Sequence, residues 1–223
     1  KQQTDNISLT LSEHAAQTFI SAEVALNSIY SALPQSSFSN EATFKQYAGQ
    51  KSVHQLLSEK ISSNPLIDVA SIALDDGRLV NFSRSYPPPP INLSERDYFQ
   101  EQRDHPAGKI YFSLPVKNKG TGKWVFYLAK RLQTPSGVFL GTLQVGVSAE
   151  NFSEFYKKVI SNLGDGASVS LYRDDFSLMT AYPFKDDLIG KKILTGSTYK
   201  LLSDPKIDHA VAEVNSPRAI QDN

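Results

Sequence analysis

The feature that most constrains the fold is a long stripe of apolar residues near the N-terminus. Apolar side chains recur at steps of three or four until Pro34 ends the series. This spacing predicts one amphipathic helix of roughly seven turns. A helix this long needs either an extended surface of its own protein or a partner helix. It can therefore lie along a core, or form a stalk or dimer helix that emerges from a membrane. The stripe consists of Ile7, Leu11, Ala15, Phe19, Ala22, Leu26, Ile29 and Leu33.

After a second predicted helix over 40–62, the apolar pattern changes to short runs rich in β-branched residues. Links of turn length join most of these runs, which predicts an antiparallel sheet with helices on its faces. Asp75-Asp76-Gly77 predicts the first hairpin turn. Ser94, with Asp97 three positions later, predicts a capping box that starts a short helix. The expected strands cover 66–74, 78–83, 109–116, 123–132 and 138–147.

The C-terminal third begins the same pattern again, with a helix expected over 150–163 and strands over 167–172 and 177–182. We interpret this as a degenerate second copy of the unit, whose last strands either lie beyond Asn223 or are absent. The predicted fold class is α+β. The predicted domains are a long N-terminal helix over 1–34, a sheet domain over 35–150 and a smaller, truncated sheet domain over 151–223.

Composition excludes several classes of function. Twenty-three basic and 23 acidic residues give a formal net charge of zero, which argues against a nucleic-acid binder. The absence of cysteine excludes disulfides, thiolate metal sites and cysteine nucleophiles. The four histidines lack metal-ligand spacing, and no nucleophile elbow or phosphate loop occurs. We therefore expect no catalytic residue, metal or cofactor in this chain, which begins and ends like a fragment of a longer protein.

A series of short motifs follows in a fixed order along the chain. They include Ile72-Ala73-Leu74-Asp75-Asp76-Gly77-Arg78-Leu79, Leu93-Ser94-Glu95-Arg96-Asp97-Tyr98-Phe99, Ser113-Leu114-Pro115-Val116, Gly122-Lys123-Trp124, Gly137-Val138-Phe139-Leu140-Gly141 and Tyr182-Pro183. In order and spacing these motifs resemble the double CACHE, or PDC-type, extracytoplasmic sensor domain. The resemblance covers essentially the whole chain and implies a long helix followed by two tandem PAS-like sheets. It is greatest to sensors fused to diguanylate cyclase or histidine kinase outputs, which implies a periplasmic position between two membrane helices.

The resemblance also implies a ligand. The amino-acid-binding branch carries an Arg-x-Trp-Tyr cluster, and Arg96-Asp97-Tyr98-Phe99 stands in its place. Arg96 matches the arginine that holds a ligand carboxylate. Ser148 replaces the aspartate that receives the ligand amine, and Pro115 replaces a tyrosine. These departures argue against an α-amino acid and leave an acidic or otherwise anionic ligand.

A carboxylate-binding pocket needs a planar cation, aromatic walls and neutral hydrogen-bond donors. In the strand over 123–132, alternation places Trp124 and Lys130 on one face, which we predict as the ligand face, and Tyr127 on the other. Trp124 could instead be a core residue, and Arg96 could simply pair with a nearby acid. The predicted ligand-binding residues are Arg96, Tyr98, Phe99, Ser83, Tyr86, Tyr111, Ser113, Trp124 and Lys130.

Two functions remain open from the sequence. In the first, the chain is a sensor that binds a small, anionic molecule in its first sheet domain and passes a conformational shift across the membrane. In the second, it is a structural or dimerisation module without a small-molecule ligand. A homodimer through the N-terminal helix is compatible with either function.

Overall fold

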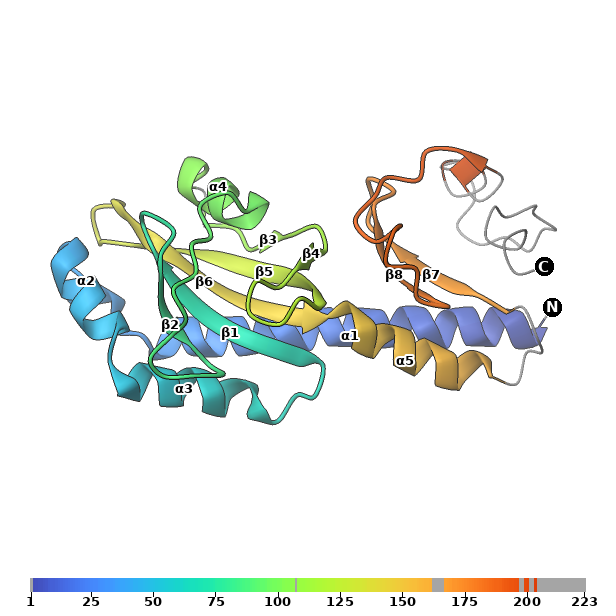
Figure 1. Cartoon of the computed structure of the whole chain (residues 1–223), viewed down its shortest axis with the longest axis horizontal. Helices are drawn as coiled ribbons and strands as arrows, with labels where there is room; N and C mark the ends of the chain where they lie inside the picture. The colour runs from blue at the N-terminus through green and yellow to red at the C-terminus, as the bar shows by residue number, and fades with distance from the viewer. Residues whose placement is uncertain (1, 107, 162–166, 197–198, 201–202, 204–223) are drawn as a thin grey trace. The chain divides into compact units, whose positions relative to one another are not determined.

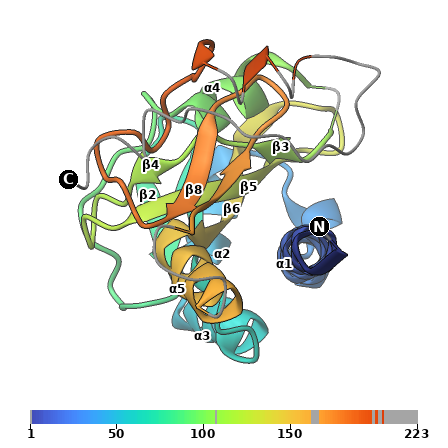
Figure 2. The same cartoon turned by 90° about the vertical axis from the view of Figure 1, so that its right-hand side faces the viewer.

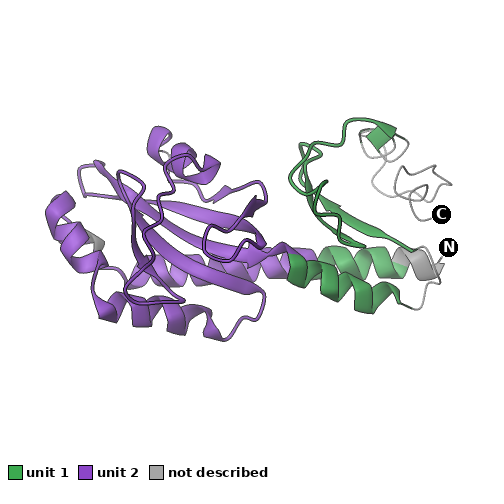
Figure 3. Ribbon diagram, viewed as in Figure 1, with its two compact units in different colours: residues 1–14, 150–223 green, residues 15–149 purple. Residues whose placement is uncertain are grey.

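The computed structural model describes residues 2–106, 108–161, 167–196, 199–200 and 203. Figure 1 shows the helices and strands of the chain. The chain divides into two compact units, one of residues 15–149 and the other of residues 1–14 with 150–223 (Figure 3). The N-terminal helix α1 (Gln2–Ala32) therefore supplies residues to both units.

The larger unit contains a six-stranded antiparallel sheet. The strand order is β2-β1-β6-β5-β3, and β4 also pairs with β5. Short hairpins connect β1 to β2 and β5 to β6, so the predicted antiparallel sheet and α+β class are confirmed. The strands are β1 (Ile67–Leu74), β2 (Leu79–Phe82), β3 (Tyr111–Phe112), β4 (Val116–Lys117), β5 (Trp124–Gln133) and β6 (Phe139–Ser148).

Helices cover both faces of this sheet. α1 and α3 (Lys51–Ser62) lie on one side, and α4 (Asp97–Asp104) lies on the other (Figure 1, Figure 2). The side chain of Phe19 in α1 packs against Phe126 in β5, with ring centroids 5.4 Å apart. The apolar stripe of α1 faces inward as predicted, since Leu11, Ala15, Ala22, Leu26, Ile29 and Leu33 are all buried.

The predicted helix over 40–62 is wrong in one respect, because the structure has two helices there. α2 (Glu41–Ala48) ends at Gly49, and α3 begins at Lys51. Asn40 caps α2: its side chain accepts from the Thr43 amide, and the Thr43 hydroxyl accepts from the Asn40 amide. The backbone carbonyls of Ala48 and Gln50 at the break accept hydrogen bonds from the buried Asn81 side chain.

Two other local predictions also need correction. α4 begins at Asp97 with Arg96 at its N-cap, so Ser94 does not form the predicted capping box. The Ser94 amide instead donates to the Asn92 side chain, which shapes the preceding loop. The predicted strand over 109–116 is split into β3 and β4. Pro115 between them has no amide proton to donate to a strand ladder.

The smaller unit contains most of α5 (Ala149–Ile160) and a two-stranded antiparallel sheet of β7 (Val169–Tyr172) and β8 (Leu178–Tyr182). Within this unit the His14 ring of α1 stacks on Phe155, with centroids 3.5 Å apart. After β8 the described residues add an isolated antiparallel bridge between Ser177 and Lys192. The part of the predicted second sheet domain beyond residue 203 lies outside the described residues. Over the ranges that the structure covers, no helix is long and apolar enough to span a bilayer.

Candidate functional site

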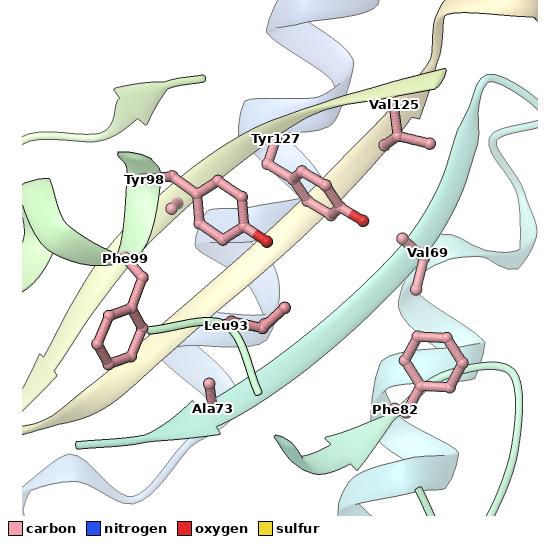
Figure 4. Close-up of a cluster of buried hydrophobic side chains, with 9 residues drawn as sticks. Val69, Ala73, Phe82, Leu93, Tyr98, Phe99, Val125 and Tyr127 are labelled. Atoms are coloured by element: carbon pink, nitrogen blue, oxygen red, sulfur yellow. The ribbon is translucent and has the colours of Figure 1, made fainter. Parts of the chain in front are cut away.

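The side of the sheet that carries α4 holds a cluster of buried apolar and aromatic residues. Tyr98 and Phe99 of α4 pack onto Tyr127 and Ala129 of β5 (Figure 4). The Tyr98 and Tyr127 rings lie with centroids 4.8 Å apart, and their hydroxyl groups point in the same direction, towards β1. Two phenol groups therefore lie together within this cluster.

Arg96 stands at the start of α4, beside this cluster. Its Nη2 donates to the carbonyl of Lys117 at 3.0 Å, which ties the helix start to β4. Its Nε lies 3.2 Å from a Glu95 carboxylate oxygen but is buried and makes no hydrogen bond. Arg96 thus does pair with a nearby acid, while its Nε meets no hydrogen-bond acceptor among the described residues.

Asn118 orients the hydroxyl of Tyr127. The Asn118 Oδ1 accepts from the amides of Gly120 and Thr121, which fixes the side-chain amide. Its Nδ2 then donates to the Tyr127 hydroxyl at 3.0 Å. Because the hydroxyl oxygen accepts this bond, its own proton points elsewhere, and none of the described residues accepts it. Tyr127 is thus a second donor beside Arg96.

The electrostatics keep both phenols protonated. Burial raises the pKa of Tyr98 well above its usual value. Burial also raises the pKa of Tyr127, and the nearby Asp68 carboxylate adds to this effect, while the Arg96 charge opposes it. Both hydroxyls are therefore neutral donors at physiological pH.

Asp68, near the start of β1, adds an acceptor to the same neighbourhood. One of its carboxylate oxygens pairs with Arg84, while the other is buried and has no hydrogen-bond partner among the described residues. The group as a whole presents donors from Arg96 and Tyr127 and an acceptor from Asp68. Such an arrangement suits binding of a small molecule that carries a carboxylate and an amine.

Five of the nine predicted ligand-binding residues lie on this face of the sheet. Besides Arg96, Tyr98 and Phe99, they are Tyr111 and Ser113. The Tyr111 hydroxyl donates to the Asp97 carboxylate at 3.3 Å. The Ser113 hydroxyl accepts from the Tyr127 amide at 2.8 Å and donates to the Leu114 carbonyl, so its hydrogen-bonding capacity serves the backbone.

The other four predicted residues do not join the cluster. Lys130 lies on the opposite face, where its Nζ donates to Asn27 and sits 3.9 Å from the Tyr30 ring centroid in α1. Trp124 shares that face of β5, and Lys117 lies over its ring. The Ser83 hydroxyl accepts from the Ala70 amide and extends the sheet pairing. Tyr86 is exposed and donates to the Gly49 carbonyl.

Sequence reasoning missed Asp68, Asn118 and Tyr127. Asp68 is preceded by Ile67 and followed by Val69, so it resembles an outward-facing residue of a half-buried strand. Asn118 stands in an Asn-Lys-Gly sequence, which is typical of a turn. Tyr127 was assigned correctly to the face opposite Lys130, and α4 on that face would have identified it. No group of three metal-binding side chains occurs in the portion that the structure covers.

Comparison with known proteins relates this chain to extracellular sensor domains. The extracellular domain of rpHK1S-Z16, a protein assigned as a histidine kinase, superposes with a TM-score of 0.68 and 28% identity, covering 87% of this chain and 75% of the other. An extracellular ligand-binding receptor from Desulfohalobium retbaense gives a TM-score of 0.62 at 12% identity over 84% of this chain and 32% of the other. The ligand-binding domain of the Campylobacter jejuni chemoreceptor Tlp3, solved with L-norvaline, gives a TM-score of 0.58 at 19% identity. The match covers 88% of this chain and 74% of the other.

No protein-family model matches the sequence. No curated protein matches it at a significant level either. The structural comparisons nevertheless agree with one another, and the chain has the fold of extracellular sensor domains of histidine kinases and chemoreceptors. The resemblance predicted from the sequence is therefore confirmed.

Proposed function

We propose that this chain is the extracytoplasmic ligand-sensing part of a transmembrane signalling receptor and binds a small carboxylate beside Arg96. The observation that carries the proposal is the buried Arg96 Nε in a sensor-domain fold: it faces Glu95 but makes no hydrogen bond among the described residues. The Arg96 charge is also close enough to Tyr127 to act on the pKa of its hydroxyl. A guanidinium is the side chain best suited to a carboxylate, because its planar donors match the two oxygens.

Asp68 extends the proposal to a ligand that also carries an amine. The sequence argued against an α-amino acid because Ser148 stands where an aspartate was expected. Asp68 supplies a carboxylate from a different strand, and one of its oxygens is buried and unpaired. The Tlp3 ligand-binding domain, which shares the fold, has been solved with L-norvaline and with L-valine. An α-amino acid is therefore the first ligand class to test.

The proposed location is the periplasm, with membrane helices in flanking segments and an output domain such as a diguanylate cyclase or a histidine kinase. The larger unit would be membrane-distal and the smaller one membrane-proximal. A ligand shifts the receptor only if it binds one conformation better than the other, with a coupling of about 1–3 kcal/mol in typical systems. The fold that this chain shares with extracellular receptor domains supports this placement.

A dimer through α1 is the second part of the proposal. Ile20 and Val24 are one turn apart on α1 and both are more than half exposed. Such a pair is well placed to pack against the same helix of a second copy. This observation also favours the alternative function, a dimerisation module without a ligand.

The ligand proposal is tested by thermal-shift measurements on the 223-residue chain with L-norvaline, L-valine, valerate and acetate. At a ligand concentration 100 times Kd, binding adds about 2.7 kcal/mol of stability, which raises Tm by several degrees. We expect Arg96→Ala and Tyr127→Phe to remove most of this rise. Arg78→Ala, which alters an exposed arginine paired with Asp76, should leave it unchanged. Equal stabilisation of wild type and Arg96→Ala would refute the site, and no stabilisation by any probe would favour the dimerisation module.

A further inference from the structure

A second polar group lies deeper on the same face of the sheet, and the Arg96 site does not use it. Gln102 of α4 and Thr142 and Gln144 of β6 are at most 2% exposed. One oxygen atom of each side chain is buried and has no hydrogen-bond partner within the described residues. We call these three residues the deep polar layer.

For Gln102, the identity of the unpaired atom follows from its neighbours. The Gln102 Nε2 donates to the carbonyls of Lys109 and Ala129, at 2.9 and 3.1 Å. Only an NH2 group can pair with two carbonyls, so the unpaired Gln102 atom is the acceptor Oε1. In Gln144 the Nε2 donates to the Ser71 hydroxyl at 2.8 Å, and the Oε1 is the atom without a partner among the described residues.

The strand register brings these atoms into one layer. Gln144 stands opposite Ala129 on one side and Ser71 on the other. Directly paired residues share a face of the sheet, and Ala129 belongs to the cluster that packs against α4. Gln102 binds the carbonyl of that same Ala129. The layer therefore lies between α4 and the sheet.

The layer is also next to the proposed ligand site. Gln144 is two residues from Gly146, which is paired with Tyr127. Residues two apart on a strand lie about 6.5–7 Å apart on the same face. Gln144 therefore stands one row of side chains from Tyr127, on the face that carries the proposed ligand site.

Three unpaired buried oxygens are costly in a folded protein, and such groups normally bind a protein group, water or ligand. Valine and leucine would fill the same positions without that cost. We infer that the deep polar layer receives the far end of the ligand, and that this end carries uncharged hydrogen-bond donors, either hydroxyl or amide N–H groups. The inference rests on the proposed function, because it extends the Arg96 site.

The charge near the layer favours a neutral donor over an ammonium group. Arg131 is paired across the sheet with Thr142 and is itself buried. Its guanidinium donates to the carbonyls of Gln102, Arg103 and Gly137. A fourth bond runs from its Nε to the Gln133 side chain, so four of the five guanidinium donors are occupied. The positive charge thus stays beside the layer and repels a second cation.

The test uses two pairs of isosteric probes: L-homoserine with L-norvaline, and 4-hydroxybutyrate with valerate. Each pair differs by a hydroxyl in place of a terminal methyl. Calorimetric titration of the 223-residue chain should show the hydroxyl member of a pair binding at least about tenfold more tightly, because the unpaired acceptors reject the methyl. Thr142→Val and Gln144→Leu should each bring the two affinities together.

Stability of the unliganded chain gives a second readout. Thr142→Val removes an unpaired hydroxyl with little change of shape, and Tm should rise by about 2–4 °C. The control is Thr134→Val. The Thr134 hydroxyl is also buried, but it accepts from the Val138 amide and bonds Ser136, so its loss should lower Tm.

Two results would overturn the inference alone: a fall of Tm in Thr142→Val like that in Thr134→Val, or methyl probes that bind as tightly as the hydroxyl probes. If neither member of either pair binds, the proposed function fails and the inference fails with it.

Discussion

At the scale of single residues, Arg131 is the charged side chain most deeply integrated in the larger unit. It is buried, and burial lowers the pKa of its guanidinium from the ordinary value. Its Nη1 donates to the carbonyls of Gln102 and Arg103 at 2.7 and 2.9 Å, at the C-terminal end of α4. The guanidinium also lies over the Phe139 ring. One side chain therefore fastens α4 to β5.

Replacing Arg131 should accordingly be costly. Arg131→Met leaves the two α4 carbonyls and the Gly137 carbonyl without their donor, and we expect a loss of about 3 kcal/mol in the free energy of unfolding. Urea denaturation measures this loss. Arg103→Met is the control, because Arg103 is exposed and paired only with the neighbouring Asp104, and should change stability by about 0.5 kcal/mol or less. A loss below about 1 kcal/mol for Arg131→Met would contradict this role.

His14 gives a prediction about pH. Burial against Phe155 and Phe152 lowers the pKa of His14 below its ordinary value of 6.5. The folded state thus disfavours the charged ring, so its stability is fully present above about pH 6.5 and falls as the pH drops below it. We expect Tm to fall more between about pH 7.5 and pH 5 in wild type than in His14→Phe. If Tm changed with pH in the same way in both proteins, protonation of His14 would not be coupled to folding.

Individual site residues were only partly predictable. The resemblance selected Arg96, and the structure places it beside two buried phenols. The alternation of β5 separated Lys130 from Tyr127 correctly, but it could not tell which face α4 covers, since both faces are largely buried. Asp68 could not be found from a pattern, because its importance depends on a contact with Arg84, 16 positions later.

At the scale of secondary-structure elements, the contact between β1 and β6 depends on a glycine. Gly141 has φ of +147° and is paired with Leu74. A Cβ at this position would lie 2.0 Å from the Ala73 carbonyl oxygen. Both the backbone conformation and the available space therefore require glycine here.

Gly141→Ala should weaken this strand pairing severely. We expect the free energy of unfolding to fall by about 3 kcal/mol or more, because a clash with backbone cannot be relieved by moving a side chain. Gly122→Ala is the matched control: Gly122 also has a positive φ, of +73°, but a Cβ there meets no atom within 4 Å. The free energy of unfolding of Gly122→Ala should fall by about 1 kcal/mol. Similar midpoints in urea for the two variants would show that the clash is relieved.

Elements with a strong periodic pattern were predicted well, and their interruptions were not. The apolar stripe predicted α1 and placed its end within two residues of the observed one, and the Asp75-Asp76-Gly77 turn predicted the first hairpin. The break between α2 and α3 depends on the tertiary contact with Asn81. The start of α4 two residues later than predicted depends on Arg96 reaching the Lys117 carbonyl. Neither contact leaves a local signature.

At the scale of the whole molecule, the proposed dimer makes a direct prediction. Val24→Glu should place charges against each other in an α1–α1 interface, and light scattering should then report a monomer where wild type is a dimer. Val138→Glu is the control, because Val138 is as exposed as Val24 (60% against 62%) but lies between β5 and β6. A monomeric wild type, or a dimer in both variants, would exclude this interface.

The fold class and the likeness to sensor domains were predictable because they depend on the order of many elements rather than on any one residue. The sequence did not predict which residues form each compact unit, since the first 14 residues belong with the C-terminal segment and not with the larger unit. Sequence patterns describe one continuous helix there. Only the packing of Leu11 and His14 reveals that its two halves belong to different units.

This division of α1 matters for anyone who wishes to build chimeric receptors. A splice at residue 150 alone would transplant Phe152 and Phe155 without His14, the ring that stacks on Phe155 and meets Phe152 edge-on. A functional exchange of the smaller unit needs two crossovers, one near residue 14 and one near residue 149. The first 14 residues and the distant C-terminal segment would then move as one unit.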